Sequence, residues 1–360
     1  MSSYDFEIGL DLHKVFSLLA TLDRNGTFLG YQRLDNSVDA FDNFFGQCNG
    51  SFRVTFECCP NWYWVADYCQ EHAIPFILSN PLLNRAIAHV HAKNDRYDAR
   101  MLAHLAQTGL IATCYVPDKN IRHLRELLFH RLKLLQVRTR FKNRIHVTLI
   151  KYNFQSPYQY IFGPHGIQWI HSCKLPPFME HSVCELLELI AALDTHIEHY
   201  DQRISDHIRD HPYYQLLRSV YGIGIIHAAT IIARVADITR FPTVQGFIRY
   251  AGLAVNTRAS ADKLTYGHLM RQSDKYLRTS FVEASHLVIR YDPGLRAFYD
   301  HLAKQKGHGC AICAVARKLA RSVYFMLKNS TPYRVRSIQG QYVQQSHRLS
   351  VQPASASSSG

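Results

Sequence analysis

Three extended runs follow one another closely at the start of the chain, and Asn25-Gly26 stands between the second and the third. Asn-Gly is a strong signal for a two-residue β-hairpin turn. Beyond the third run, helical and extended periodicities alternate as far as Gly109, a residue suited to ending a helix. We expect strands at 6–11, 15–23, 27–34, 52–57 and 75–79, and helices at 37–48, 61–72 and 94–109.

Three meandering strands followed by helix, strand, helix, strand and helix is the order of the RNase H fold. We therefore predict an α/β domain of the RNase H or RuvC-like type over residues 1–117. In that fold the first and fourth strands are adjacent and parallel at the centre of the sheet. Side chains at the carboxyl ends of these two strands are expected to emerge at one edge.

Acidic residues stand at the ends of these elements. Asp11 ends the first strand, Glu57 ends the fourth, and Asp95 and Asp98 share one face at the start of a helix. Taken singly, each acid could be a helix cap or an ordinary strand-end residue. Four converging carboxylates cannot all stay ionised without a cation. We therefore expect them to bind Mg²⁺, as two ions that activate the attacking oxygen and stabilise the leaving oxygen of a phosphodiester.

The remainder of the chain predicts two long helices, a mainly helical domain and a tail. Residues 118–151 contain no Gly or Pro, and apolar residues recur in coiled-coil spacing from Val183 to Ile204. An arm over 118–212 is expected; the alternative is a helical hairpin packed on its own domain. Residues 213–329 are mostly helical in pattern with a polar break at 256–273, and 330–360 predict a disordered tail.

Positive charge is concentrated in two regions. The net charge is +13, and residues 118–151 carry 10 Lys and Arg against 2 Asp and Glu, while residues 213–360 carry 20 against 6. Such patches attract nucleic acid through its phosphates, although a merely soluble basic surface is the alternative. Gly222-Ile223-Gly224 could present backbone amides to a phosphate, or could be a tight turn. The helical candidates for phosphate contact are Arg138, Arg140, Lys142 and Arg144.

Other classes of protein are disfavoured. No apolar run reaches the roughly 20 residues of a membrane span, so no membrane partner is expected. The first residues lack a signal peptide's basic and apolar regions, and nine scattered Cys fit free thiols in a reducing cytoplasm. A cytoplasmic location is therefore expected.

The sequence resembles the DEDD transposases of the insertion sequence 110 family, relatives of the Piv DNA invertase, some of which are guided by a bridge RNA. The resemblance covers about residues 5–328. The paired-Asp segment and the Gly-Ile-Gly segment are its most specific parts. The matching segments are Gly9–Lys14, Phe56-Glu57, Asn80-Pro81, Lys93–Ala99, Val220–Gly224, Phe241, Tyr250–Leu253 and Asp274–Arg278.

The resemblance implies a RuvC-like domain, a coiled-coil arm and a helical transposase domain that carries a nucleophilic serine. Ser260 falls at the serine's position, but Val255 replaces the family's Pro, Ala261 replaces a Gly, and Ser273 replaces a Gly. Serine needs activation by its surroundings. Cations near it that could hold the scissile phosphate are Arg258, Lys263, Arg271, Lys275 and Arg278.

The expected function is DNA transposition or site-specific recombination by phosphoryl transfer, with DNA and a noncoding guide RNA as partners. A nucleophile in a second domain requires a composite site, so a homo-oligomer, a dimer or a tetramer, is expected. One rival is a metal-dependent nuclease of the Holliday-junction resolvase class that forms no covalent intermediate. The other rival is a nucleic-acid-binding protein without catalytic activity.

Overall fold

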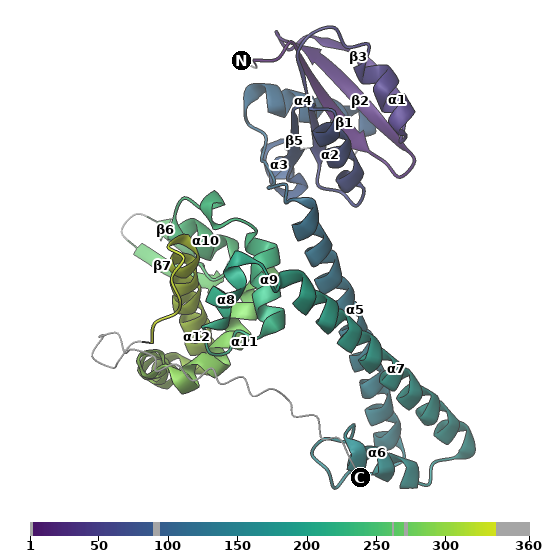
Figure 1. Ribbon diagram of the computed structural model, residues 1–360, viewed down its shortest axis with the longest axis vertical. Coiled ribbons are helices and arrows are strands. Elements are labelled where there is room, and N and C mark those ends of the chain that lie inside the picture. The colour runs from purple at the N-terminus through teal and green to yellow at the C-terminus, as the bar shows by residue number, and fades with distance from the viewer. Residues whose placement is uncertain (1–2, 89–93, 261–262, 270–272, 336–360) are drawn as a thin grey trace, which may run out of the picture. The chain divides into compact units, whose positions relative to one another are not determined.

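The computed structural model describes residues 3–88, 94–260, 263–269 and 273–335, and Figure 1 shows its ribbon. The chain divides into two compact units, Met1–Val116 and Pro117–Gly360. The first is an α/β unit built on a mixed sheet, and the second is largely helical. None of the described helices is both long and apolar enough to cross a lipid bilayer.

The sheet of the first unit has the strand order β3-β2-β1-β4-β5. The first three strands are antiparallel neighbours, whereas β1, β4 and β5 run parallel. All five strands lie close to the positions predicted from the extended apolar runs and the Asn25-Gly26 turn. Their bounds are β1 Phe6–Leu12, β2 Phe16–Asp23, β3 Phe28–Asp35, β4 Phe52–Glu57 and β5 Phe76–Ser79.

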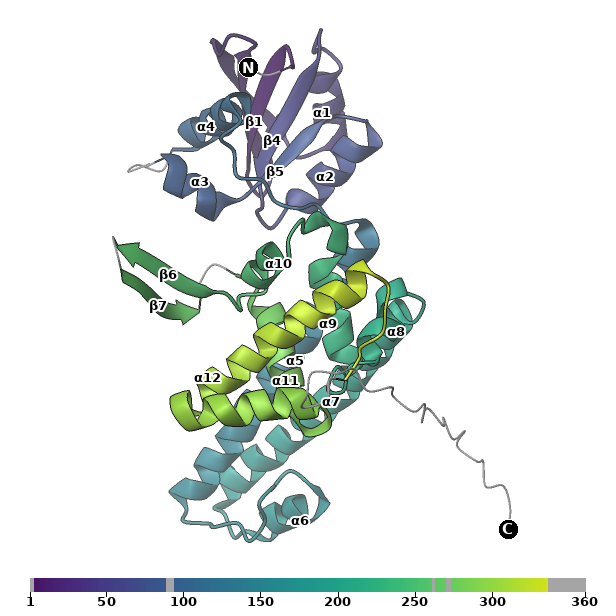
Figure 2. The same cartoon turned by 90° about the vertical axis from the view of Figure 1, so that its left-hand side faces the viewer.

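Helices cover both faces of this sheet. Figure 2 shows α1 and α2 on one side of the strands and α4 on the other. On the α1–α2 side, Ile8 and Leu10 of β1 pack with Phe41 and Val65 in a fully buried core. Three of the helices were predicted, and α3 was not. Their bounds are α1 Val38–Phe45, α2 Trp62–Glu71, α3 Pro81–Ala88 and α4 Asp95–Thr108.

The opposite face of β1 lets α4 approach very closely. A Cβ atom at Gly9 would lie 1.9 Å from the carbonyl oxygen of Ala99 and 2.6 Å from the amide nitrogen of Ala103. Further along the same face, the buried Glu7 pairs with Arg53, whose Nη2 also donates to the carbonyl oxygen of Ala106 at 3.1 Å. The helix backbone therefore rests directly on the strand, in an orientation that brings the helix start to the end of β1.

We expect Gly9→Ala to lower the free energy of unfolding by about 3 kcal/mol, because the added methyl group would overlap backbone atoms that cannot turn aside. Urea denaturation followed by circular dichroism measures this change. Gly224→Ala is the control, because that glycine has φ −76° and a Cβ there would contact nothing within 4 Å. Equal stability of the Gly9→Ala and parent proteins would contradict the packing described here.

The second unit begins with two long helices, α5 (Lys119–Lys151) and α7 (Pro177–Ile208), and α6 (Pro164–Ser172) lies at their far end (Figure 1). The two long helices lie side by side. The predicted apolar seam faces inward at every seventh residue: Val183, Ile190, Ile197 and Ile204 are each at most 6% exposed. Two ion pairs a heptad apart, Arg131–Asp201 and Arg138–Asp194, join the helices along their length.

The remaining helices pack into the largest core of the chain, which contains Phe247, Phe281 and Leu319. The predicted polar break contains a two-stranded antiparallel hairpin that the sequence pattern did not predict. A non-helical Gly307, with φ 78°, interrupts the last helix. The bounds are α8 Pro212–Arg218, α9 Ile225–Val235, η1 Ile238–Arg240, α10 Val244–Tyr250, β6 Val255–Ser260, β7 Lys263–Leu269, α11 Lys275–Tyr291 and α12 Pro293–Lys328.

The chain beyond α12 stays packed for longer than the predicted start of the tail at residue 330. Tyr333 is 6% exposed and Val335 is 8% exposed. The hydroxyl of Tyr333 donates to the buried Asp292 at 2.7 Å, and its backbone amide donates to Ser219 Oγ at 2.8 Å. These contacts hold the segment on the helical core as far as 335, and residues 336–360 of the predicted tail lie outside the described residues.

Candidate active site

Two of the four predicted acids occupy neighbouring strand ends. Asp11 lies next to last in β1, and Glu57 is the last residue of β4. The parallel register pairs Leu10 with Phe56, so the following residue on each strand is an acid. Since the carboxyl ends of parallel strands meet at one edge, Asp11 and Glu57 share that edge of the sheet.

The other two acids lie in the first turn of α4, which begins directly after Asn94. The side-chain oxygen of Asn94 accepts a hydrogen bond from the backbone amide of Arg96 at 3.0 Å and so caps the helix. Acidic residues are favourable at this end of a helix because of its dipole. The close approach of α4 to Gly9 brings this turn, with Asp95 and Asp98, toward Asp11.

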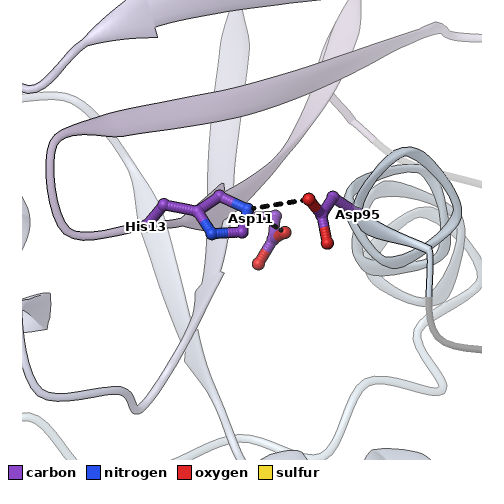
Figure 3. Close-up of side chains that lie close together, drawn as sticks. All are labelled: Asp11, His13 and Asp95. Carbon is purple, nitrogen blue, oxygen red and sulfur yellow. Dashed lines mark ion pairs between the residues drawn. The ribbon is translucent and has the colours of Figure 1, made fainter.

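A histidine that the sequence analysis did not select lies between the two groups of acids. His13 Nε2 is 3.0 Å from Asp11 Oδ2 and 3.3 Å from Asp95 Oδ2, as Figure 3 shows. Donor atoms of these three residues all lie within 4.8 Å of one another. The signal was present in the sequence, since His13 falls inside the segment Gly9–Lys14 that carries the family resemblance.

The carboxylate of Asp11 is partly buried and lies near other negative charges. Burial raises the pKa of this carboxyl above its ordinary value, because a charged carboxylate is poorly solvated there. His13 opposes this shift, whereas the negative charges of Asp95 and Asp98 raise the pKa further. A divalent cation would relieve this repulsion, and two carboxylates with an imidazole form a donor set that such cations bind. The residues present therefore fit a metal site.

The predicted nucleophile lies in the hairpin of the second unit. Ser260 ends β6, and the antiparallel register pairs it with Lys263, the first residue of β7. The structure describes the backbone here and at Arg258. Ala261 and Arg271 lie outside the described residues.

Ser273, the other serine of this segment, is held by protein contacts. The guanidinium of Arg278 donates to Ser273 Oγ. Gly252 has φ +68°, and a Cβ there would lie 2.4 Å from the same oxygen. The adjacent Asp274 caps α11 by accepting from the amide of Leu277 at 2.9 Å. Arg278, predicted to hold a phosphate, thus also supports the turn before α11, whereas Lys275 is exposed.

The two glycines of the Gly-Ile-Gly segment have different surroundings. Gly222 has φ +93°, and a Cβ there would lie 2.5 Å from the carbonyl oxygen of Ala284, so packing against α11 requires a glycine. Gly224 precedes α9, and a Cβ there would contact nothing within 4 Å. The open start of α9 is the part of this turn that a phosphate could approach.

The four predicted basic residues of α5 also differ. Arg138 pairs with Asp194 of α7, and Lys142 Nζ donates to the hydroxyl of Tyr160 at 3.0 Å. Arg140 and Arg144 are exposed. The exposed pair is therefore better placed to meet a phosphate than Arg138.

Comparisons with known proteins identify matching families and relatives. A family model described as "Transposase IS116/IS110/IS902 family" matches residues 214–300, and a model for DEDD transposases of the IS110 group matches residues 8–154. The transposase for insertion sequence element IS1328 of Yersinia enterocolitica is 23% identical over 339 residues, which cover 91% of this chain and 98% of that protein. The transposase for IS1111A of Coxiella burnetii is 22% identical over 279 residues, 73% of this chain and 71% of that protein.

Another relative has a higher sequence identity over a shorter part of the chain. A 43.6 kDa protein of insertion element IS110 from Streptomyces coelicolor is 30% identical over 137 residues, and the match spans 38% of this chain and 34% of that protein. These findings define an enzyme of the transposase class. The chain belongs to the IS110 family of insertion-sequence transposases. The DEDD designation of the family model also indicates dependence on a divalent metal.

Proposed function

We propose that this transposase cuts and rejoins DNA at a metal site of the RNase H or RuvC-like type in its first unit. The observation that carries the proposal is the meeting of Asp11, on a central strand, with Asp95, on a helix start, around one point. The strand order, with β1 between an antiparallel β2 and a parallel β4, supports the fold assignment.

Asp11, Glu57, Asp95 and Asp98 would hold two Mg²⁺ ions. When bound, such ions supply charge stabilisation to the attacking and leaving oxygens of a phosphodiester. The four carboxylates would fix where the ions bind. Asp11 is placed by β1, and Asp95 is placed by the Asn94 cap and by the packing of α4 on Gly9.

Ser260 is the proposed nucleophile. Its hydroxyl oxygen attacks the scissile phosphorus, and the bond from phosphorus to the 3′ oxygen breaks. The serine hydroxyl gives up its proton, and the departing 3′ oxygen takes up one proton to become a 3′-hydroxyl. A 3′-hydroxyl then attacks the phosphoserine, re-forms a phosphodiester and returns the serine hydroxyl. Arg258, Lys263 and Lys275 offset the charge that develops on the phosphate. The place of Ser260 in a family segment supports this role.

The α5–α7 arm, which we propose to be a coiled coil, is the candidate interface of a homo-oligomer that completes the site. The resemblance to bridge-RNA-guided recombinases supports a noncoding guide RNA as a further partner. The exposed Arg140 and Arg144 of the arm support contact with nucleic acid, as does the absence of any Asp or Glu between Glu126 and Glu180 in the sequence.

The test is recombination by the purified full-length protein. The reaction contains three further components: Mg²⁺, a plasmid that carries the ends of the protein's own element, and RNA transcribed from the DNA flanking the reading frame. The proposal predicts rejoined recombinant products, and it predicts their loss when EDTA removes the metal. Metal-dependent nicking without rejoining would instead favour the nuclease that forms no covalent intermediate.

We expect the double variant Arg140→Gln/Arg144→Gln to bind DNA with a weaker dependence on salt. If each side chain meets one phosphate, the slope of log affinity against log salt falls by about 1.8 in magnitude. Fluorescence anisotropy with a labelled duplex at several salt concentrations measures it. Arg138→Gln is the matched control two residues away; it should lower the melting temperature of the arm, since Asp194 loses its partner, and leave the slope nearly unchanged. Equal slopes for the parent and the double variant would exclude this contact.

A further inference from the structure

The backbone of His13 is held at the acidic edge by three hydrogen bonds, and its ring is held by stacking on Phe16. Its carbonyl oxygen accepts hydrogen bonds from Asn36 Nδ2 at 2.7 Å and from Asn61 Nδ2 at 2.8 Å. Its amide donates to the carbonyl oxygen of Phe16 at 3.0 Å, and its ring stacks on the Phe16 ring with a centroid separation of 4.5 Å. These contacts hold His13 between β1 and β2 and limit the directions in which its ring can turn.

The Nε2 atom of His13 is turned into the acidic cluster. It is shielded from solvent, and two carboxylate oxygens, of Asp11 and Asp95, lie 3.0 and 3.3 Å from it. Ligands at neighbouring corners of an octahedron with bonds of 2.0–2.2 Å are about 2.8–3.1 Å apart. The two separations are therefore close to those between ligands that share one cation.

We propose that His13 is itself a ligand of the metal site, with Asp11 and Asp95, and that its nitrogen makes this site prefer Mn²⁺ to Mg²⁺. This inference rests on the proposed metal-dependent function. Mg²⁺ is a hard cation that favours oxygen ligands, whereas an imidazole nitrogen favours transition metals. A site of carboxylates alone would show a weaker preference for Mn²⁺.

The rival explanation is that His13 only neutralises the carboxylates and leaves when a cation enters. The two explanations predict opposite effects of His13→Ala. A ligand that is removed weakens Mn²⁺ binding, whereas a competing positive charge that is removed strengthens it. His104→Ala is the control variant, because His104 is an exposed residue further along α4.

Electron paramagnetic resonance on the full-length protein separates these cases. Titration of free Mn²⁺ gives its affinity, and competition gives the affinity for Mg²⁺. We expect Mn²⁺ to bind the parent and His104→Ala proteins at least about tenfold more tightly than Mg²⁺. In His13→Ala the affinity for Mn²⁺ should fall by about tenfold or more, with a smaller change for Mg²⁺.

Pulsed electron paramagnetic resonance on Mn²⁺ bound to the parent protein supplies a second readout, which does not depend on whether His13→Ala folds. The parent protein should show coupling to an imidazole ¹⁴N nucleus, and ¹⁵N-labelled histidine should convert it to ¹⁵N coupling. Bound Mn²⁺ without this coupling, together with unchanged or tighter binding in His13→Ala, would overturn the role of His13 and leave the carboxylate site intact. Failure of Mn²⁺ and Mg²⁺ to bind the parent protein at all would overturn the proposed metal site together with this inference.

Discussion

Asp11→Asn should lower the rate of DNA strand cleavage by about 10³-fold or more, because it removes a negative charge from the centre of the proposed metal site. Asp11 stands on a central strand, its carboxylate is close to His13 and Asp95, and its side chain is only 25% exposed. The substitution preserves the shape of the side chain, so the fold and DNA binding should persist. Cleavage of a labelled DNA substrate in Mg²⁺ and an electrophoretic binding assay measure the two properties separately.

Asp39→Asn is the matched control for this experiment. Asp39 is an exposed acid in the first turn of α1, in the same unit. It should cleave DNA like the parent protein. Cleavage by Asp11→Asn within a fewfold of the parent rate, with the same dependence on Mg²⁺, would contradict the metal-site assignment.

Ser260→Ala should abolish strand cleavage and leave folding and DNA binding intact. The hydroxyl is the only group removed, and in the proposed mechanism it forms the bond to phosphorus, so no other group substitutes for it. Ser273→Ala is the informative companion. Since Arg278 donates to Ser273 Oγ and Gly252 packs against it, we expect loss of some stability and retention of cleavage. The opposite pattern, an inactive Ser273→Ala and an active Ser260→Ala, would transfer the role of nucleophile to Ser273.

The sheet of the first unit could be predicted because its strands are short apolar runs, of which β1 and β4 alternate apolar and polar residues, and because Asn25-Gly26 marks a turn. The β6–β7 hairpin could not be predicted, because it lies in a polar segment with no continuous apolar alternation and so gives no periodic signal of a buried face. The helix α3 was missed although Leu83 and Ile87 stand four residues apart, at helical spacing. The packing of residues 331–335 was missed for a related reason, since single contacts of Tyr333, and not a periodic pattern, hold this segment.

The acids of the site were predicted from strand ends and helix starts, and the structure brings Asp11 and Asp95 together. His13 was missed because its ring meets Asp95, 82 residues away in the sequence, only once α4 packs on β1. Likewise, the count of charges in the sequence could not show that Arg138 forms an ion pair within the protein whereas Arg140 is exposed. The pairing of Arg138 with Asp194, 56 residues away, depends on how α5 and α7 are aligned.

In the proposed function a carboxylate–metal site and Ser260 act together on DNA through a covalent intermediate. The most direct measurement is to quench the reaction of the full-length protein with its element ends in denaturant, digest the DNA and locate the modified residue by mass spectrometry. The account predicts a nucleotide joined through phosphate to Ser260 in the parent protein, and no such adduct in Asp11→Asn or in EDTA. Efficient cleavage by the parent protein with no adduct on any residue would contradict the account and favour a nuclease that uses metal ions alone.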